Sequence, residues 1–164
     1  GTGGDVQIAV DAIGSASQPH HYLGVTAQGR SAIVETTGNP YSHVILRGGK
    51  QPNYDASSVD DVAEMLANAG LPQRIMIDAS HANSRKKPER QADVARDIAH
   101  QVGRGDRRIF GMMLESHLVE GKQSGDGELT YGQSITDACM GWERTEGVLH
   151  EIAEAVRKRR KAEG

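Results

Sequence analysis

Three apolar runs of strand length each end in polar side chains that can carry chemistry. One run leads into a cluster of Asp, Ser, His and Asn that contains His81, a second ends on Arg47, and a third ends on Glu115. Buried strands that deliver polar groups at their carboxyl ends are how α/β barrels build active sites. The pattern predicts parallel strands that bring Arg47, His81 and Glu115 to one rim.

The length and composition limit the class of protein. The chain has 164 residues, and residues 1–164 are expected to form a single partial domain. Its net charge of -3 argues against a nucleic-acid partner, and its single cysteine excludes an internal disulfide, which fits a reducing cytoplasm. No apolar run approaches the ~20 residues that a membrane span requires, so no membrane association is expected.

The order of the predicted elements indicates an α/β fold with a parallel sheet, because strand–helix units repeat along the chain. A closed eight-stranded barrel takes about 250 residues, whereas this chain offers four candidate barrel strands. We therefore expect half of a barrel, whose unpaired edges favour association. Helices are expected at about 6–16, 59–69, 89–102 and 145–160, and the strands of a hairpin at 22–26 and 31–36.

Local signals add finer expectations. Ser57 or Ser58 is expected to cap the helix that follows it. Ser134 or Thr136 is expected to open a further helix. That helix would carry Asp137 in its first turn and Cys139 on its apolar side. The glycine-rich stretch at 119–132 is expected to be a mobile loop.

The three best candidates for metal ligands are His81, Glu115 and Asp137. An imidazole together with carboxylates makes a borderline site that suits Mn, Fe, Zn or Co. Each residue also has a structural interpretation, since a histidine at a strand end is often only hydrogen-bonded and Asp137 could be a carboxylate at a helix start. His117, two residues after Glu115, could support the site or pack in the core.

Arg47 is a candidate for anion binding. A guanidinium grips phosphate or carboxylate with two hydrogen bonds, and the glycines at 48 and 49 would let the backbone approach a ligand. The alternative is an arginine in a structural ion pair, and the residue types alone leave both open.

Four ordered motifs resemble one enzyme family. They lie at 45–54, 76–84, 115–121 and 134–142 and contain Ile-Leu-Arg-Gly-Gly-Lys, Met-Ile-Asp-Ala-Ser-His-Ala-Asn-Ser, Glu-Ser-His-Leu-Val-Glu-Gly and Ser-Ile-Thr-Asp-Ala-Cys-Met-Gly-Trp. They resemble the C-terminal half of class I 3-deoxy-D-arabino-heptulosonate-7-phosphate (DAHP) synthases, over essentially the whole chain. The implied fold is the C-terminal half of a (β/α)8 TIM barrel with an inserted β-hairpin.

The resemblance implies a transferase of the shikimate pathway, which leads to the aromatic amino acids. The family condenses phosphoenolpyruvate with erythrose 4-phosphate and needs a divalent metal. By motif, His81, Glu115 and Asp137 match three of its four metal ligands. Arg47 matches a residue that binds phosphoenolpyruvate through its phosphate.

Departures from the family pattern qualify this expectation. The fourth metal ligand of the family is a cysteine in the N-terminal half, and Cys139 lies in a different motif. The Lys-Pro-Arg-Thr and Gly-Phe-Lys-Asn segments that contact the substrates are also absent. The chain is therefore expected to carry about half of the active site. It should be inactive alone and active only with its missing N-terminal half, and we expect it to associate with that half or with itself as a homo-oligomer.

Two other interpretations remain open. The chain could be a non-catalytic half-barrel that self-associates and retains residual metal or phosphate binding. It could also be a related barrel aldolase of the 3-deoxy-octulosonate 8-phosphate synthase type. The Ser-Ile-Thr-Asp-Ala-Cys motif and the Pro-Asn-Tyr element at 52–54 disfavour that last interpretation.

Overall fold

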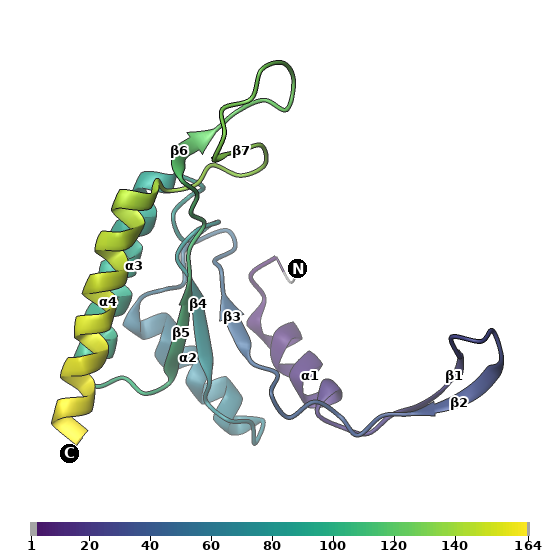
Figure 1. Cartoon of the computed structure of the whole chain (residues 1–164). Coiled ribbons are helices and arrows are strands. Elements are labelled where there is room, and N and C mark those ends of the chain that lie inside the picture. The colour runs from purple at the N-terminus through teal and green to yellow at the C-terminus, as the bar shows by residue number, and fades with distance from the viewer. Residues whose placement is uncertain (1–2, 164) are drawn as a thin grey trace.

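A parallel sheet of three strands lies at the centre of the structure (Figure 1). The computed structural model describes residues 3–163. Its sheet runs in the order β3 (Val44–Leu46), β4 (Ile75–Asp78) and β5 (Ile109–Met113). Parallel neighbours need crossover connections, and a helix lies in each connection. Three strands in this sheet are one fewer than the sequence led us to expect.

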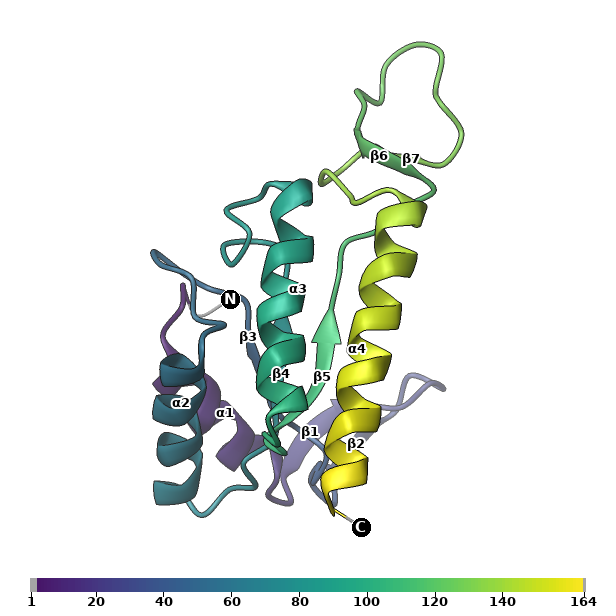
Figure 2. The same ribbon diagram turned by 90° about the vertical axis from the view of Figure 1, so that its left-hand side faces the viewer.

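Helices cover one face of this sheet. They are α2 (Ala56–Asn68), α3 (Pro88–Gly103) and α4 (Trp142–Glu163), whereas α1 (Val6–Ala16) lies beside β3 at the edge of the sheet and contacts α2 (Figure 1). Figure 2 shows α2, α3 and α4 in front of the strands, with α3 and α4 side by side. Aliphatic side chains from the strands and helices form the buried core between these two layers. Within residues 3–163, none of the helices combines the length and apolarity needed to cross a membrane.

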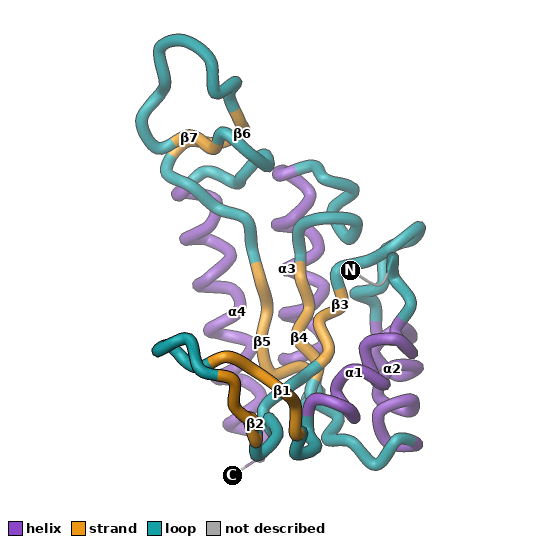
Figure 3. The backbone as a smooth tube through the Cα atoms, turned by 90° about the vertical axis from the view of Figure 1, so that its right-hand side faces the viewer, coloured by secondary structure: helices purple, strands orange, loops and turns teal. Residues whose placement is uncertain are grey.

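The other face of the sheet is open, as seen in Figure 3, where α3 and α4 lie behind the strands. In β3, Val44 and Leu46 are buried against the helices, whereas Ile45 between them is 42% exposed. On β5, Phe110 is 47% and Met113 is 37% exposed. Side chains alternate between the two faces of a strand, but the register shift between the pairs Ile75–Ile109 and Met76–Gly111 inserts one extra residue in β5. Phe110 and Met113 can therefore both face away from the helices. The open face is apolar and has no cover among the described residues.

The expected hairpin is present. Strands β1 (His21–Val25) and β2 (Ser31–Glu35) pair antiparallel. A tight turn joins them, in which the amide of Thr26 donates to the carbonyl of Arg30 at 2.9 Å and Gly29 has a φ of +76°. The hairpin projects away from the sheet and helices (Figure 1).

The segment before α4 departs from expectation, because no helix begins at Ser134 or Thr136. It contains β7 (Gln133–Ser134), which pairs with β6 (Val119–Lys122) inside the stretch that we expected to be a loop. The backbone of Cys139 exchanges hydrogen bonds with Gly121 at 2.8 and 3.1 Å. This pairing with a distant part of the chain replaces helical bonds, and the helix begins only at Trp142 and continues to its end without a break.

The cap of α2 also differs from expectation, since Asp55 replaces Ser57 or Ser58 in that role. Its carboxylate accepts hydrogen bonds from the amide of Ser58 at 3.0 Å and from the Ser58 hydroxyl at 2.8 Å. Partial burial raises the pKa of Asp55, but the hydrogen bonds from Ser58 outweigh it and hold the pKa below its usual value. The charged carboxylate is therefore the form that the folded helix favours.

Asp55→Ala is expected to lower the free energy of unfolding by about 1 kcal/mol. Because the folded pKa of Asp55 is depressed, this contribution should be present above its ordinary pKa and disappear as the pH falls through the folded value. Urea unfolding at several pH values measures both effects. Ser57→Ala is the control, and a loss as large as that of Asp55→Ala would restore the original assignment of the cap.

Candidate metal centre

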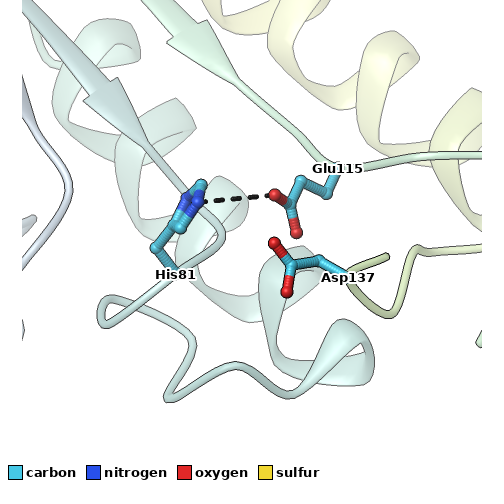
Figure 4. Close-up of side chains that lie close together, drawn as sticks. All are labelled: His81, Glu115 and Asp137. Atoms are coloured by element: carbon cyan, nitrogen blue, oxygen red, sulfur yellow. Dashed lines mark ion pairs between the residues drawn. The ribbon is translucent and has the colours of Figure 1, made fainter. Parts of the chain in front are cut away.

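Three potential ligands converge at the carboxyl end of the sheet. His81 follows β4, Glu115 follows β5, and Asp137 lies in the segment before α4. Figure 4 shows the three side chains pointing toward one another. The Nε2 atom of His81 lies 3.5 Å from Oε1 of Glu115, and one ligand atom from each residue lies within 4.8 Å of the others. The three residues that the sequence suggested as metal ligands therefore lie close together in the folded chain.

The space between these groups matches a single ion. Together with the residues around them, they line a pocket of about 20 Å³, which is enough for one water-sized particle. Metal–ligand bonds of about 2.0–2.2 Å to nitrogen and oxygen would need only a small inward movement of the three side chains. One imidazole and two carboxylates are a donor set that suits borderline divalent cations, so the residues present fit a metal.

The imidazole of His81 is oriented by a buried carboxylate. Nδ1 of His81 lies 2.7 Å from Oδ2 of Asp78, and the hydroxyl of Ser80 donates to Oδ1 of Asp78 at 2.6 Å. Asp78 is only 1% exposed. A proton on Nδ1, donated to Asp78, leaves the lone pair of Nε2 directed at Glu115, an arrangement typical of metal-binding histidines. We did not single out Asp78 from the sequence, although a carboxylate three residues before a strand-end histidine was a usable signal.

The backbone at His81 is itself unusual. Its φ is +44°, in the left-handed region that residues other than glycine rarely adopt. The amide of Lys86 donates to the carbonyl of His81 at 2.7 Å, and the amide of Ala82 donates to the carbonyl of Arg47 at 3.2 Å. Strained conformations that the surrounding bonds hold in place cluster at functional sites, which supports a role for this loop in binding.

Glu115 lies in an environment that disfavours its charge. Burial raises the pKa of Glu115, a protonated His81 would oppose that rise, and the charges of Asp137 and Asp78 add to it. Arg47 also lowers the pKa of Glu115. A cation among the carboxylates would remove this penalty, which is a second reason why a metal fits the site.

Asp137 and Cys139 lie differently from what we expected. Asp137 is exposed in a bend that follows β7, not in the first turn of a helix. Cys139 is half-buried beside the candidate site instead of lying on an apolar helix side, and its thiol lies 3.5 Å from the carbonyl of Asp137. Burial raises the pKa of the Cys139 thiol, and the charges of Glu115 and Asp137 raise it further.

Arg47 follows β3 at the same end of the sheet, and its loop is joined to the loop of His81. The side-chain amide of the buried Asn83 donates to the carbonyls of Leu46 at 3.0 Å and Asp78 at 2.8 Å. Its oxygen accepts from the amide of Asn53 at 2.8 Å, and the Asn53 side chain accepts from the amide of Gly48 at 2.7 Å. These bonds position the candidate anion group relative to the candidate metal ligands.

Gly48→Ala should disturb this junction. Gly48 has a φ of +74°, and a Cβ there would lie 2.8 Å from the Cβ of Ala82 and 3.0 Å from the amide of Asn83. The substitution is expected to lower the free energy of unfolding by roughly 2 kcal/mol or more. Gly29→Ala is the matched control, because Gly29 has a φ of +76° with nothing within 4 Å of the added carbon. Equal losses in urea unfolding would show that the contacts at Gly48 do not matter.

The side chain of His117 is not buried in the core. Its ring accepts a hydrogen bond from the amide of Leu118 at 2.8 Å and is exposed. With Trp142 and other mostly apolar side chains it lines a groove of about 650 Å³ beside α4. The core role considered for His117 is therefore wrong, and no side-chain hydrogen bond among the described residues links it to His81, Glu115 or Asp137.

Curated proteins of one family are similar to this chain over nearly its whole length. The phospho-2-dehydro-3-deoxyheptonate aldolase, Phe-sensitive, of Escherichia coli K12 is 54% identical over 162 residues, which cover 98% of this chain and 46% of that protein. The tyrosine-inhibited enzyme of Schizosaccharomyces pombe is 51% identical over 167 residues, covering 98% of this chain and 45% of that protein. The chain spans about half the length of the curated relatives it matches.

A solved structure gives the same result. The phospho-2-dehydro-3-deoxyheptonate aldolase from Francisella tularensis SCHU S4 superposes with a TM-score of 0.90 at 47% identity, over 95% of this chain and 46% of that one. The model of the DAHP synthetase I family matches residues 2–150. This chain therefore belongs to the DAHP synthetase I family.

Proposed function

We propose that this chain supplies the metal-binding part of a DAHP synthase active site, which condenses phosphoenolpyruvate with erythrose 4-phosphate and water to give DAHP and phosphate. The observation that carries the proposal is the convergence of His81, Glu115 and Asp137 at the carboxyl end of a parallel sheet in a member of this family. Nε2 of His81 and one oxygen from each carboxylate would hold a divalent cation such as Mn, Fe, Zn or Co.

Each of these groups has a distinct task in that reaction. When bound, the cation supplies Lewis-acid polarisation of the aldehyde of erythrose 4-phosphate. Asp78 keeps the His81 imidazole in the orientation that frees Nε2. Arg47 binds the phosphate of phosphoenolpyruvate through its guanidinium, so that the enol carbon faces the aldehyde. After this carbon attacks the aldehyde, water adds at C2 and phosphate leaves.

We also propose that residues 1–164 are one partial domain, half of a (β/α)8 barrel from which the hairpin of β1 and β2 projects. Support comes from the apolar side chains on the open sheet face and from the groove beside α4, both of which lack cover among residues 3–163. In a closed barrel, the strands of the other half would pair with the free edges and fill this face.

Complementation tests the catalytic proposal. The chain is assayed alone and after co-expression with the N-terminal part of the E. coli Phe-sensitive relative, the part that this chain does not match. Consumption of phosphoenolpyruvate in the presence of erythrose 4-phosphate and Mn²⁺ is expected only for the pair. It should be lost when this chain carries Glu115→Ala. A co-purifying, folded pair that binds both substrates without turnover would contradict the proposal.

A second candidate function is a non-catalytic half-barrel that self-associates. The exposed apolar groups Ile45, Phe110 and Met113 on the open face favour it, because a second copy could bury them. Light scattering of the purified chain separates the cases. We expect a dimer or larger assembly that dissociates when the N-terminal half is supplied. A folded monomer under all conditions would contradict both the self-association and the half-barrel proposal.

A further inference from the structure

We propose that Gln91 is a positioning residue for the candidate metal centre, acting through the backbone of Glu115. This inference rests on the proposed metal site. Gln91 lies in α3, is 1% exposed, and borders the same small pocket as His81, Glu115 and Asp137. A fully buried glutamine on the core side of an amphipathic helix costs free energy unless its amide is bonded, so its partners indicate what it does.

Both polar atoms of the Gln91 side chain bind the same residue. The amide of Glu115 donates to Oε1 of Gln91 at 2.9 Å, and Nε2 of Gln91 donates to the carbonyl of Glu115 at 3.2 Å. The side-chain amide thus pairs with the backbone of Glu115 in the way a neighbouring strand would. One residue therefore satisfies both backbone groups of a candidate ligand.

The hydrogen bonds from Gln91 lie where the backbone pairing between β4 and β5 ends. The last backbone bond between the two strand ends runs from the amide of Ala79 to the carbonyl of Met113 at 2.9 Å. Beyond it the chain after β4 turns into the left-handed loop at His81 and can no longer pair with the chain after β5. From the helix side, Gln91 extends the hydrogen-bonded pairing by two residues, from Met113 to Glu115.

The carbonyl of Glu115 has a second partner that extends the same framework. It accepts from the amide of Met140 at 2.9 Å, and the carbonyl of Met140 accepts from the amide of His117 at 2.9 Å. Asp137 lies three residues before Met140. Gln91 and Met140 therefore fix Glu115 from two sides and set its distance from the other two candidate ligands.

Gln91→Met tests this role, because methionine has nearly the same length and volume but forms no such bonds. Mn²⁺ alone is the probe, titrated into the chain at a temperature where circular dichroism shows both proteins folded. We expect the dissociation constant to rise by about 10-fold or more, the range seen when groups behind metal ligands are removed. The EPR line shape of bound Mn²⁺ should also change, which a purely structural role would not produce.

Gln101→Met is the matched control. Gln101 lies in the same helix, and its Nε2 donates to the carbonyl of Tyr54 at 2.8 Å and to Asp97 at 2.6 Å, away from the candidate ligands. This variant should lose stability while its affinity for Mn²⁺ stays within about twofold of the parent. A similar loss of affinity in both variants would overturn the specific role of Gln91.

Amide exchange of the parent chain gives a test that does not depend on a variant. The amide of Glu115 should exchange with solvent as slowly as those inside β5, and exchange at the rate of the exposed segment near Tyr131 would overturn the pairing with Gln91. If the parent chain binds Mn²⁺ and Gln91→Met binds it equally well, only this inference fails. If the parent chain does not bind Mn²⁺, the metal site and the role of Gln91 fail together.

Discussion

His81→Ala is expected to abolish measurable binding of Mn²⁺, with a loss of affinity of at least about 100-fold. Removing a ligand should cost more than the 10- to 100-fold seen for the groups behind ligands. The substitution removes the Nε2 atom that faces Glu115 at 3.5 Å and leaves two carboxylates, one of them on an exposed segment. Titration monitored by the EPR signal of free Mn²⁺ measures the loss directly, without any assay of activity.

Two further variants make this result specific. His100→Ala changes an exposed histidine on α3 that lies outside the candidate site and should leave the affinity unaltered. Glu115→Ala should match His81→Ala. If both His81→Ala and Glu115→Ala bind Mn²⁺ like the parent chain, the assignment of these ligands is wrong.

Asn83→Leu is expected to lower the free energy of unfolding by about 3 kcal/mol or more. The side chain of Asn83 is 4% exposed and forms three hydrogen bonds to backbone groups, at Leu46, Asp78 and Asn53. Each buried backbone group left without its partner costs about 1–3 kcal/mol, and leucine has a similar size but cannot replace any of the bonds. Urea unfolding followed by circular dichroism gives the value.

The control for this second prediction is Asn68→Leu, at the exposed end of α2, where the change should stay within about 0.5 kcal/mol. A loss at Asn83 no larger than at Asn68 would mean that the bonds between the Arg47 and His81 loops contribute little. Because these bonds join the two loops, Asn83→Leu should also weaken binding of Mn²⁺, in contrast to Gln101→Met.

The parts of the site that the sequence could predict are those governed by local pattern. His81 and Glu115 each follow an apolar run, and strands that are parallel must deliver their ends to one edge. The hairpin and α1 could also be predicted from the sequence, because turn residues and the capping residue Asp5 act on their immediate neighbours.

The parts that could not be predicted depend on partners far away in the chain. The periodicity of residues 134–142 is compatible with a helix, but the backbone of Cys139 pairs with Gly121 instead, and tertiary pairing overrides a weak local preference. Gln91 and Asn83 look like ordinary polar residues of a helix and a loop. Their importance comes from Glu115 and from the end of β3, which no local pattern reveals.

The three candidate ligands come from three different segments of the chain, each following its own strand or preceding α4. A cation held by all of them would act as a removable cross-link that closes two long loops of polypeptide. A disulfide constrains the unfolded chain. This link would exist only in the folded chain, so its binding free energy would add to the free energy of unfolding, and a chelator would remove it. Binding of such a cation would therefore be coupled to the order of the loops that carry the three ligands.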